Sequence, residues 1–284
     1  MRIEVNGARL WYDVEGASLH PSGATMRERP TVVLVHGGPG SYDHSYFKPH
    51  FGWLAELAQV VYLDLRDHGR SSRHAPSAWN FELCADDLRR FCDAVGIERP
   101  IVFGHSMGGF VAIAYAARHP AHPAGMILQS TMARFDLDRL VEGFREAAGD
   151  EVADLARRDY GGDPIGDAEW ARVFAAFGPV VPDADTLARR IRNAAVGERG
   201  MDLMRRLDML DFLARVTCPT LVCTGDLDAV TPVAAAREIL AALPAGVGRL
   251  EVVEGAGHFP WLDRPSAYRQ VIETFVATAA GGRP

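Results

Sequence analysis

Continuous apolar runs rich in β-branched residues recur along the chain, and helical segments separate them. The first long run is Thr31–Val35, and the later ones lie at 59–65, 100–104, 125–128, 220–224 and 249–253. Continuous apolar runs are typical of strands buried on both faces. Helical periodicity is found between them and after the last, at 81–95, 107–118, 232–243 and 265–277. This alternation predicts an α/β fold with a doubly wound, mostly parallel sheet.

The pattern differs at the N-terminus. Residues 2–14 alternate apolar and polar positions around Asn6-Gly7, which predicts an antiparallel hairpin at one edge of the sheet. Residues 16–30 are rich in Gly, Ser and Pro. Such a composition predicts a loose connection without regular structure.

The alternation is also interrupted between 132 and 212, where helical segments follow one another with Gly-Gly and Gly-Pro breakers. We expect these residues to form a helical cap (lid), inserted in an α/β core built from 1–131 and 213–284. Open α/β sheets bind ligands at the carboxyl ends of their strands. A cap inserted between two core strands would therefore supply walls of the substrate site.

Composition narrows the class of protein. The 284 residues are 48% hydrophobic and carry a net charge of −7, which disfavours nucleic acid as a partner. No signal-peptide core or membrane-length apolar run is present, so we expect a cytoplasmic protein with no membrane partner. We expect the protein to be a monomer or a small homo-oligomer. The four cysteines have neither metal-knuckle nor redox CxxC spacing and are interpreted as buried free thiols.

The chemistry centres on Ser106, in the run Gly-His-Ser-Met-Gly at 104–108. Gly-x-Ser-x-Gly alone is a weak motif. Here a buried strand precedes it and a helix of small residues follows it, as a nucleophile elbow requires. The alternative, that Ser106 only caps the following helix, does not account for this setting. Ser106 is therefore the predicted nucleophile.

A serine hydroxyl needs a base and an acid that orients it. In this arrangement the chain order is Ser, acid, His, and His258 is the only one of ten histidines beyond position 122. The acid should follow the strand at 220–224, where Asp226 and Asp228 both stand. Asp228 is preferred because it lies further into the loop, while Asp226 is expected to bind loop amides.

The oxyanion formed on attack needs fixed donors. We expect the backbone N–H of Met107, directly after the nucleophile, and that of Gly38 in the turn His36-Gly37-Gly38-Pro39-Gly40. His36 precedes the acid in the chain and is interpreted as an anchor of this turn. His105, beside Ser106, is expected to point away from the site and to serve packing.

Together these residues resemble the α/β-hydrolase family over nearly the whole chain. The turn at 36–40 and the segment Asp64-Leu65-Arg66-Asp67-His68-Gly69-Arg70-Ser71 resemble the proline iminopeptidase branch. Two features depart from that branch: Asp67 replaces a glycine, and the elbow carries Met107 where those peptidases typically have Trp. The Met form is commoner in esterases, lactonases and carbon–carbon bond hydrolases of the family.

The resemblance implies a serine hydrolase that cleaves a small-molecule ester, lactone or amide through an acyl-enzyme. A carbon–carbon bond hydrolase or lyase on the same triad is the alternative, followed by a ligand-binding receptor with a vestigial site. No cofactor and no metal is expected.

Two sets of cap side chains could bind charged substrate groups but are interpreted as solvated: the arginines at 189, 190 and 192, and the glutamates at 142, 146, 151, 169 and 198.

Overall fold

The computed structural model describes residues 1–281, and an eight-stranded sheet organises them. Its strand order is β1-β2-β6-β5-β7-β8-β9-β10. The antiparallel hairpin of β1 (Arg2–Val5) and β2 (Ala8–Glu15) forms one edge, as the alternating pattern predicted. All the later strands of this sheet run parallel to one another. The predicted doubly wound, mostly parallel sheet is thus confirmed.

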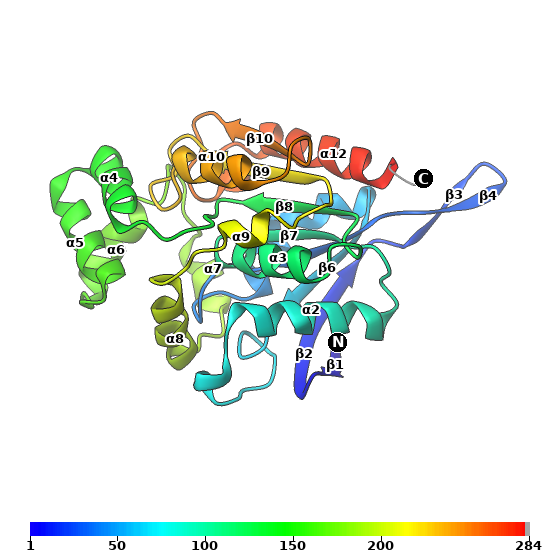
Figure 1. The fold of residues 1–284 in the computed structure, drawn as a ribbon, viewed down its shortest axis with the longest axis horizontal. Helices are drawn as coiled ribbons and strands as arrows, with labels where there is room; N and C mark the ends of the chain where they lie inside the picture. The colour runs from blue at the N-terminus through cyan, green and yellow to red at the C-terminus, as the bar shows by residue number, and fades with distance from the viewer. Residues whose placement is uncertain (282–284) are drawn as a thin grey trace.

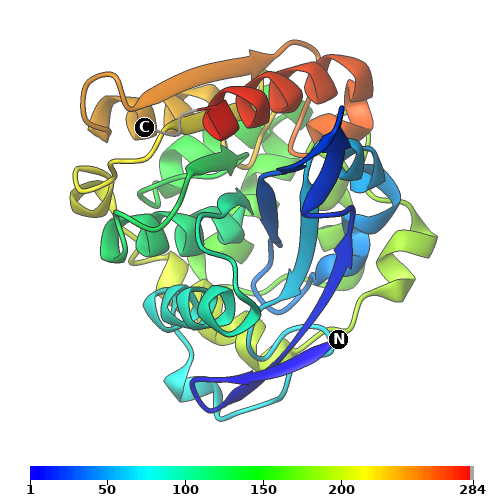
Figure 2. The ribbon, with the colours of Figure 1, turned by 90° about the vertical axis from the view of Figure 1, so that its right-hand side faces the viewer.

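The parallel strands follow the apolar runs closely. They are β5 (Thr31–Val35), β6 (Gln59–Asp64), β7 (Ile101–His105), β8 (Gly125–Gln129), β9 (Thr220–Gly225) and β10 (Gly248–Val253). The side chains of Val32 to Val35 are completely buried, as expected for a strand covered on both faces. Figure 2 shows this covering, with α2 (Phe81–Val95) and α3 (Met107–Arg118) on one face of the sheet and α12 (Pro265–Gly281) on the other.

Local signals set the ends of these helices. The Asn80 side chain accepts a hydrogen bond from the Leu83 N–H at the start of α2, and Gly96 closes the helix at φ +76°.

The remaining core helices are α1 (Lys48–Phe51), α10 (Val233–Ala242) and α11 (Pro260–Asp263), with 3₁₀ turns η1 (His44–Tyr46), η2 (Gly52–Glu56) and η3 (Pro76–Ala78). All four cysteines are buried and unpaired, as predicted.

The prediction of a loose connection without regular structure at 16–30 is wrong. Residues there form a two-stranded antiparallel ribbon, β3 (Leu19–Ser22) and β4 (Thr25–Glu28), which projects from the body at the right of Figure 1. Gly23, at φ +63°, lies in its turn. Both strands are mostly exposed, so no buried face imposed an alternating pattern on the sequence.

Helices fill the interval between β8 and β9. They are α4 (Leu137–Ala148), α5 (Asp150–Gly161), α6 (Asp167–Ala175), α7 (Ala184–Arg189), α8 (Ala194–Met204) and α9 (Leu210–Leu213). In Figure 1, α4, α5 and α6 stand at the left, beyond the end of the sheet from which the chain leaves β8. None of the helices in the described part of the chain is long and apolar enough to cross a membrane.

Candidate active site

Ser106 occupies a sharp turn between β7 and α3. Its backbone has φ +52° and ψ −121°, a conformation that costs a non-glycine residue about 1–3 kcal/mol. The flanking glycines make the turn possible: a Cβ on Gly104 would lie 2.4 Å from the Gly108 oxygen, and a Cβ on Gly108 would lie 2.2 Å from the Val35 oxygen. The strand–turn–helix geometry predicted for a nucleophile elbow is therefore present.

Neighbouring strands hold this strained residue in place. The Ser106 N–H donates to the Gln129 carbonyl at 2.9 Å, at the end of β8. The Ser106 carbonyl accepts from the Thr131 hydroxyl and from the Gly109 N–H, both at 2.8 Å. Ser106 itself is partly exposed, while the residues on either side are buried. Its hydroxyl can thus meet a small molecule at the carboxyl end of the sheet.

The structure brings Asp228 and His258 together. The His258 Nδ1 atom lies 3.1 and 3.0 Å from the two carboxylate oxygens of Asp228, and both residues are buried. Asp228 also accepts the N–H groups of Val230 and Thr231 and the hydroxyl proton of Thr231. These donors fix the carboxylate, which in turn fixes the orientation of the imidazole.

Asp226, the other acid considered from the sequence, lies elsewhere. One of its carboxylate oxygens accepts the N–H of Gly255 at 2.6 Å and that of Ala256 at 3.3 Å. It therefore binds loop amides, which is the role expected for it. Asp228 is the residue placed to orient His258.

His258 is also held through its backbone, by contacts that the sequence did not reveal. Its N–H donates to the Phe177 carbonyl in the segment after α6, at 2.8 Å. Its carbonyl lies 3.0 Å from Nε2 of His105. His105 packs among aromatic rings, as expected, but it also contacts His258, so the expectation that it points away from the site is wrong. A signal was available, because a histidine in a fully buried strand needs a partner for each ring nitrogen.

The glycine-rich turn after β5 lies directly against the elbow. A Cβ on Gly37 would lie 3.3 Å from the Ser106 Cβ, and one on Gly38 would lie 3.6 Å from the sulfur of Met107. Gly38 has φ +142°, a conformation that favours glycine. Within residues 1–281, the N–H groups of Gly38 and Met107 donate to no protein acceptor. Two backbone amides near the serine therefore remain available.

Two buried histidines brace this turn. His36 accepts the Leu65 N–H at Nε2, so its Nδ1–H donates to the Gly37 carbonyl at 2.7 Å. His68 accepts the Gly40 N–H at Nε2 and donates from Nδ1 to the Arg66 carbonyl. His36 is thus an anchor of the turn, as interpreted from the sequence, and His68 is a second anchor.

Stability is expected to decrease as the pH falls below about 6.5, because buried histidines stay neutral in the folded protein. Burial lowers the pKa of His36 and of His105, and it lowers the pKa of His68 to about 3. Between pH 6.5 and about 3, His68 therefore binds more protons in the unfolded chain than in the folded one, and His36 and His105 act in the same direction. The stabilisation is complete above about pH 6.5 and is lost at about 1.4 kcal/mol per pH unit for each such histidine.

Urea unfolding at pH 7, 6 and 5 would measure this dependence. His68→Gln, which keeps a side-chain acceptor for Gly40 but cannot titrate, should reduce the slope by about the contribution of one histidine. An unchanged slope in that variant would contradict the assignment of a neutral, buried His68.

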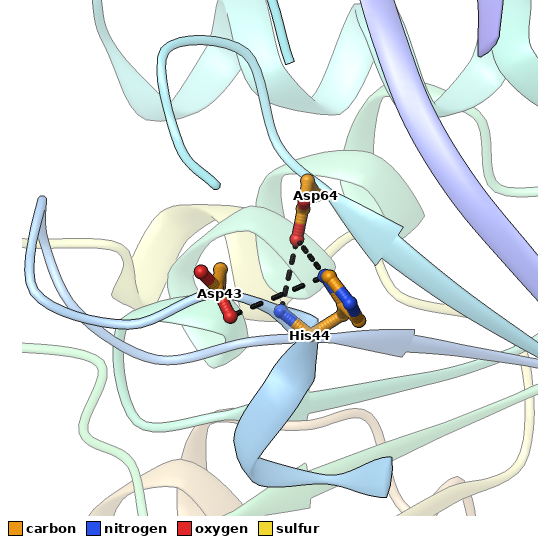
Figure 3. A group of neighbouring side chains, drawn as sticks. All are labelled: Asp43, His44 and Asp64. Atoms are coloured by element: carbon orange, nitrogen blue, oxygen red, sulfur yellow. Dashed lines mark hydrogen bonds and ion pairs between the residues drawn. The ribbon is translucent and has the colours of Figure 1, made fainter. Parts of the chain in front are cut away.

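One group of ligand-type side chains stands near the turn in the described chain, formed by Asp43, His44 and Asp64 (Figure 3). Its carboxylate oxygens are already engaged by N–H donors. Asp64 accepts the backbone N–H and Nδ1–H of His44 and the N–H of Arg70, and Asp43 accepts the N–H groups of Ser45 and Ile191. We interpret the group as a hydrogen-bonded brace and assign it no metal.

Comparison with known proteins places the chain in a family context. The family model described as alpha/beta hydrolase fold matches residues 30–265. A proline iminopeptidase, PfmaB, of Pestalotiopsis fici is 27% identical over 245 residues, which cover 81% of this chain and 83% of that protein. A pimeloyl-[acyl-carrier protein] methyl ester esterase of Neisseria meningitidis serogroup A is 29% identical over 257 residues, covering 86% and 76%.

Solved structures agree on the fold. The crystal structure of a proline iminopeptidase of Mycobacterium smegmatis superimposes with a TM-score of 0.77 at 21% identity, covering 98% of both chains. At that identity the likeness concerns the fold alone.

Proposed function

Because this chain is a hydrolase of the α/β-hydrolase family, we propose that it cleaves a small-molecule ester, lactone or amide through an acyl-enzyme formed on Ser106. The observation that carries the proposal is the buried pairing of Asp228 with His258 at 3.0 Å, with the His258 carbonyl 3.0 Å from Nε2 of His105, the residue directly before the strained Ser106. A serine, a base and an orienting acid supplied in this chain order make up the machinery of acyl transfer.

The tautomer of His258 follows from its partner. An ionised Asp228 can only accept, so Nδ1 of His258 carries the proton and Nε2 is left as a base. The base removes the Ser106 proton as the hydroxyl oxygen attacks the substrate carbonyl, and then delivers that proton to the leaving group. Water repeats the sequence on the acyl-enzyme and releases the acid.

The free amides of Gly38 and Met107 are assigned as the oxyanion hole. Both donors sit on rigid backbone, one in a turn braced by His36 and His68 and one at the N-terminus of α3. Such donors stabilise charge as it develops and need no reorganisation during the reaction. Loss of one of them typically costs about 10²–10³ in rate.

We assign residues 132–212 as the cap over this site. Its segments contact the catalytic loops through the backbone: the Phe177 carbonyl accepts from His258, and Asn193 donates its N–H to the Gly40 carbonyl at 2.8 Å. The Asn193 side chain donates to the Asp67 carbonyl at 2.9 Å. The cap thus joins both the base loop and the glycine turn, and it is well placed to form substrate contacts.

Gly178 in the cap leaves no room for a side chain beside the loop that carries His258. A Cβ on Gly178 would lie 2.7 Å from the Gly257 Cα and 3.2 Å from the His258 nitrogen. Gly178→Ala is therefore expected to displace the His258 loop and lower kcat by up to about 10²-fold, because small misplacements of catalytic groups are costly. Steady-state hydrolysis of a reporter ester would measure the loss.

Gly161→Ala, also in the cap, is the matched control. Its Cβ would meet only a leucine methyl group, at 3.7 Å, and should leave kcat near the wild-type value. Equal kcat values in the two variants would contradict a role for the Gly178 contact.

The bond class is inferred from the cap and from the relatives. One relative carries the name of a peptidase and another that of a methyl ester esterase. The free amine of an aminopeptidase substrate would need an acidic partner in the cap. Three of the cap glutamates, at 142, 151 and 169, pair instead with surface arginines. We therefore place esters and lactones before N-terminal proline amides.

The test is a hydrolysis panel of p-nitrophenyl esters, lactones and proline-naphthylamide, combined with labelling by a fluorophosphonate. Turnover of the esters or lactones, with labelling of Ser106, is the expected result. Labelling without turnover of any panel member would favour the carbon–carbon hydrolase or lyase. Absence of both would overturn the proposal in favour of a receptor with a vestigial site.

A further inference from the structure

His105 ends β7 directly before Ser106, and its imidazole is buried against the catalytic histidine. The ring centroid lies 4.8 Å from that of His258 and 4.9 Å from that of Trp261. Both nitrogens are engaged: Nε2 lies 3.0 Å from the His258 carbonyl oxygen, and Nδ1 lies 2.8 Å from the hydroxyl of Tyr46. The same hydroxyl lies 2.9 Å from the backbone nitrogen of Gly37.

The direction of each hydrogen bond can be derived. A carbonyl only accepts, so Nε2 of His105 carries the proton and donates it to His258. Nδ1 must then accept, which makes the Tyr46 hydroxyl its donor. The hydroxyl oxygen in turn accepts the N–H of Gly37. One continuous chain therefore runs from Gly37 through Tyr46 and His105 to His258, with every polar atom satisfied.

This series of hydrogen bonds connects the two loops whose relative position matters for acyl transfer. Gly37 precedes Gly38, whose amide is assigned to the oxyanion hole, and His258 carries the base. We propose that His105 is a positioning residue, which acts with Tyr46 to fix the distance between the oxyanion turn and the general base. The inference rests on the proposed function, because it assigns roles to Gly38 and His258.

Burial among aromatic rings keeps the hydrogen-bonded side chains of Tyr46 and His105 neutral. Tyr46 and His105 are 1% and 2% exposed, and aromatic rings of Phe47, Phe259 and Trp261 surround His105. Burial lowers the pKa of His105 well below its usual value, with a further contribution from His258, and raises the pKa of Tyr46 well above its usual value. Tyr46 and His105 therefore hold the two loops in place without exchanging protons with Ser106 or His258.

Three variants of the full-length protein test the proposal. His105→Leu removes both hydrogen bonds, and His105→Gln keeps an amide N–H that can donate to the His258 carbonyl. Tyr46→Phe removes only the hydroxyl that links His105 to Gly37. Steady-state kinetics on the best panel substrate would be measured beside the melting temperature, so that lost stability is separated from lost positioning.

We expect His105→Leu to lower kcat by about 10²-fold with little change in KM, since misplaced groups act on the transition state. His105→Gln should recover most of that loss, and Tyr46→Phe should lie between them. Equal losses in the Leu and Gln variants, or wild-type kcat in a folded Leu variant, would overturn the proposal.

The hydrogen-bond chain has a second measurement that needs no turnover. The ¹⁵N NMR spectrum of the ring should show His105 as the neutral Nε2–H tautomer across the pH range in which the protein is folded. The Nδ1–H tautomer, or titration near neutral pH, would overturn the chain even if the enzyme is active. A normal NMR result in a protein inactive on every substrate and unreactive with the fluorophosphonate would instead overturn the proposed function, and the positioning role with it.

Discussion

Ser106→Ala is expected to lower kcat by about 10⁶-fold, the largest effect of any single change in this chain. The substitution removes the oxygen that forms the acyl-enzyme and leaves the turn otherwise intact. Alanine bears a Cβ as serine does, so the strained φ of +52° costs the variant about as much as the wild type. Circular dichroism and a thermal melt should therefore match the wild type. The residual rate on a p-nitrophenyl ester would be measured with enzyme in excess.

Ser130 supplies the matched control. It also has a positive φ, of +45°, and is buried at the end of β8, beside the strand that carries Ser106. Its hydroxyl accepts a hydrogen bond from the Gln129 side chain. Ser130→Ala should cost some stability but retain near wild-type kcat. Substantial turnover in Ser106→Ala, or a comparable loss in both variants, would refute Ser106 as the nucleophile.

The sequence was sufficient for the parts of the fold that depend on side-chain pattern. Buried parallel strands are apolar throughout, so Thr31–Val35 and Ile101–His105 stand out without reference to the rest of the chain. Helix α2 could be bounded at both ends because Asn80 caps it and Gly96 terminates it. The β3–β4 ribbon escaped prediction because neither of its faces is buried.

In the candidate site, too, the sequence predicts some features and not others. Ser106 and His258 were predicted from the motif and from chain order, and the structure brings Asp228 to His258 rather than Asp226. The contacts of Phe177 and Gly178 with the His258 loop join segments about 80 residues apart through backbone atoms, which leave no side-chain signature in a single sequence. The burial of His105 indicated that each ring nitrogen needs a partner, but which partners it contacts follows from the packing of η1 and α11 around β7, which no local pattern encodes.

Asp228→Asn is expected to lower kcat by about 10⁴-fold, because it imposes the wrong tautomer on His258. The N–H groups of Val230 and Thr231 both donate to Oδ1 of Asp228, at 2.9 and 2.8 Å. An asparagine must keep its carbonyl oxygen at that position, so its NH₂ group faces Nδ1 of His258. The retained carbonyl oxygen also lies 3.1 Å from Nδ1, but the NH₂ group at the Oδ2 position, 3.0 Å away, is a donor and favours an accepting Nδ1 with the imidazole proton on Nε2. A protonated Nε2 cannot take the proton of Ser106.

Asp226→Asn is the matched control, two residues away in the same loop. The Asp226 oxygen that accepts from Gly255 and Ala256 can be replaced by an amide oxygen, so this variant should retain kcat within about a few-fold. Folding should be preserved in both variants, and the ¹H NMR signal of the Nδ1 proton should disappear only in Asp228→Asn. A larger loss of kcat in Asp226→Asn than in Asp228→Asn would contradict the assignment of Asp228. In that case the hydrogen bond between Asp228 and His258 would have a structural role, and the proton removed from Ser106 would need a base oriented in another way.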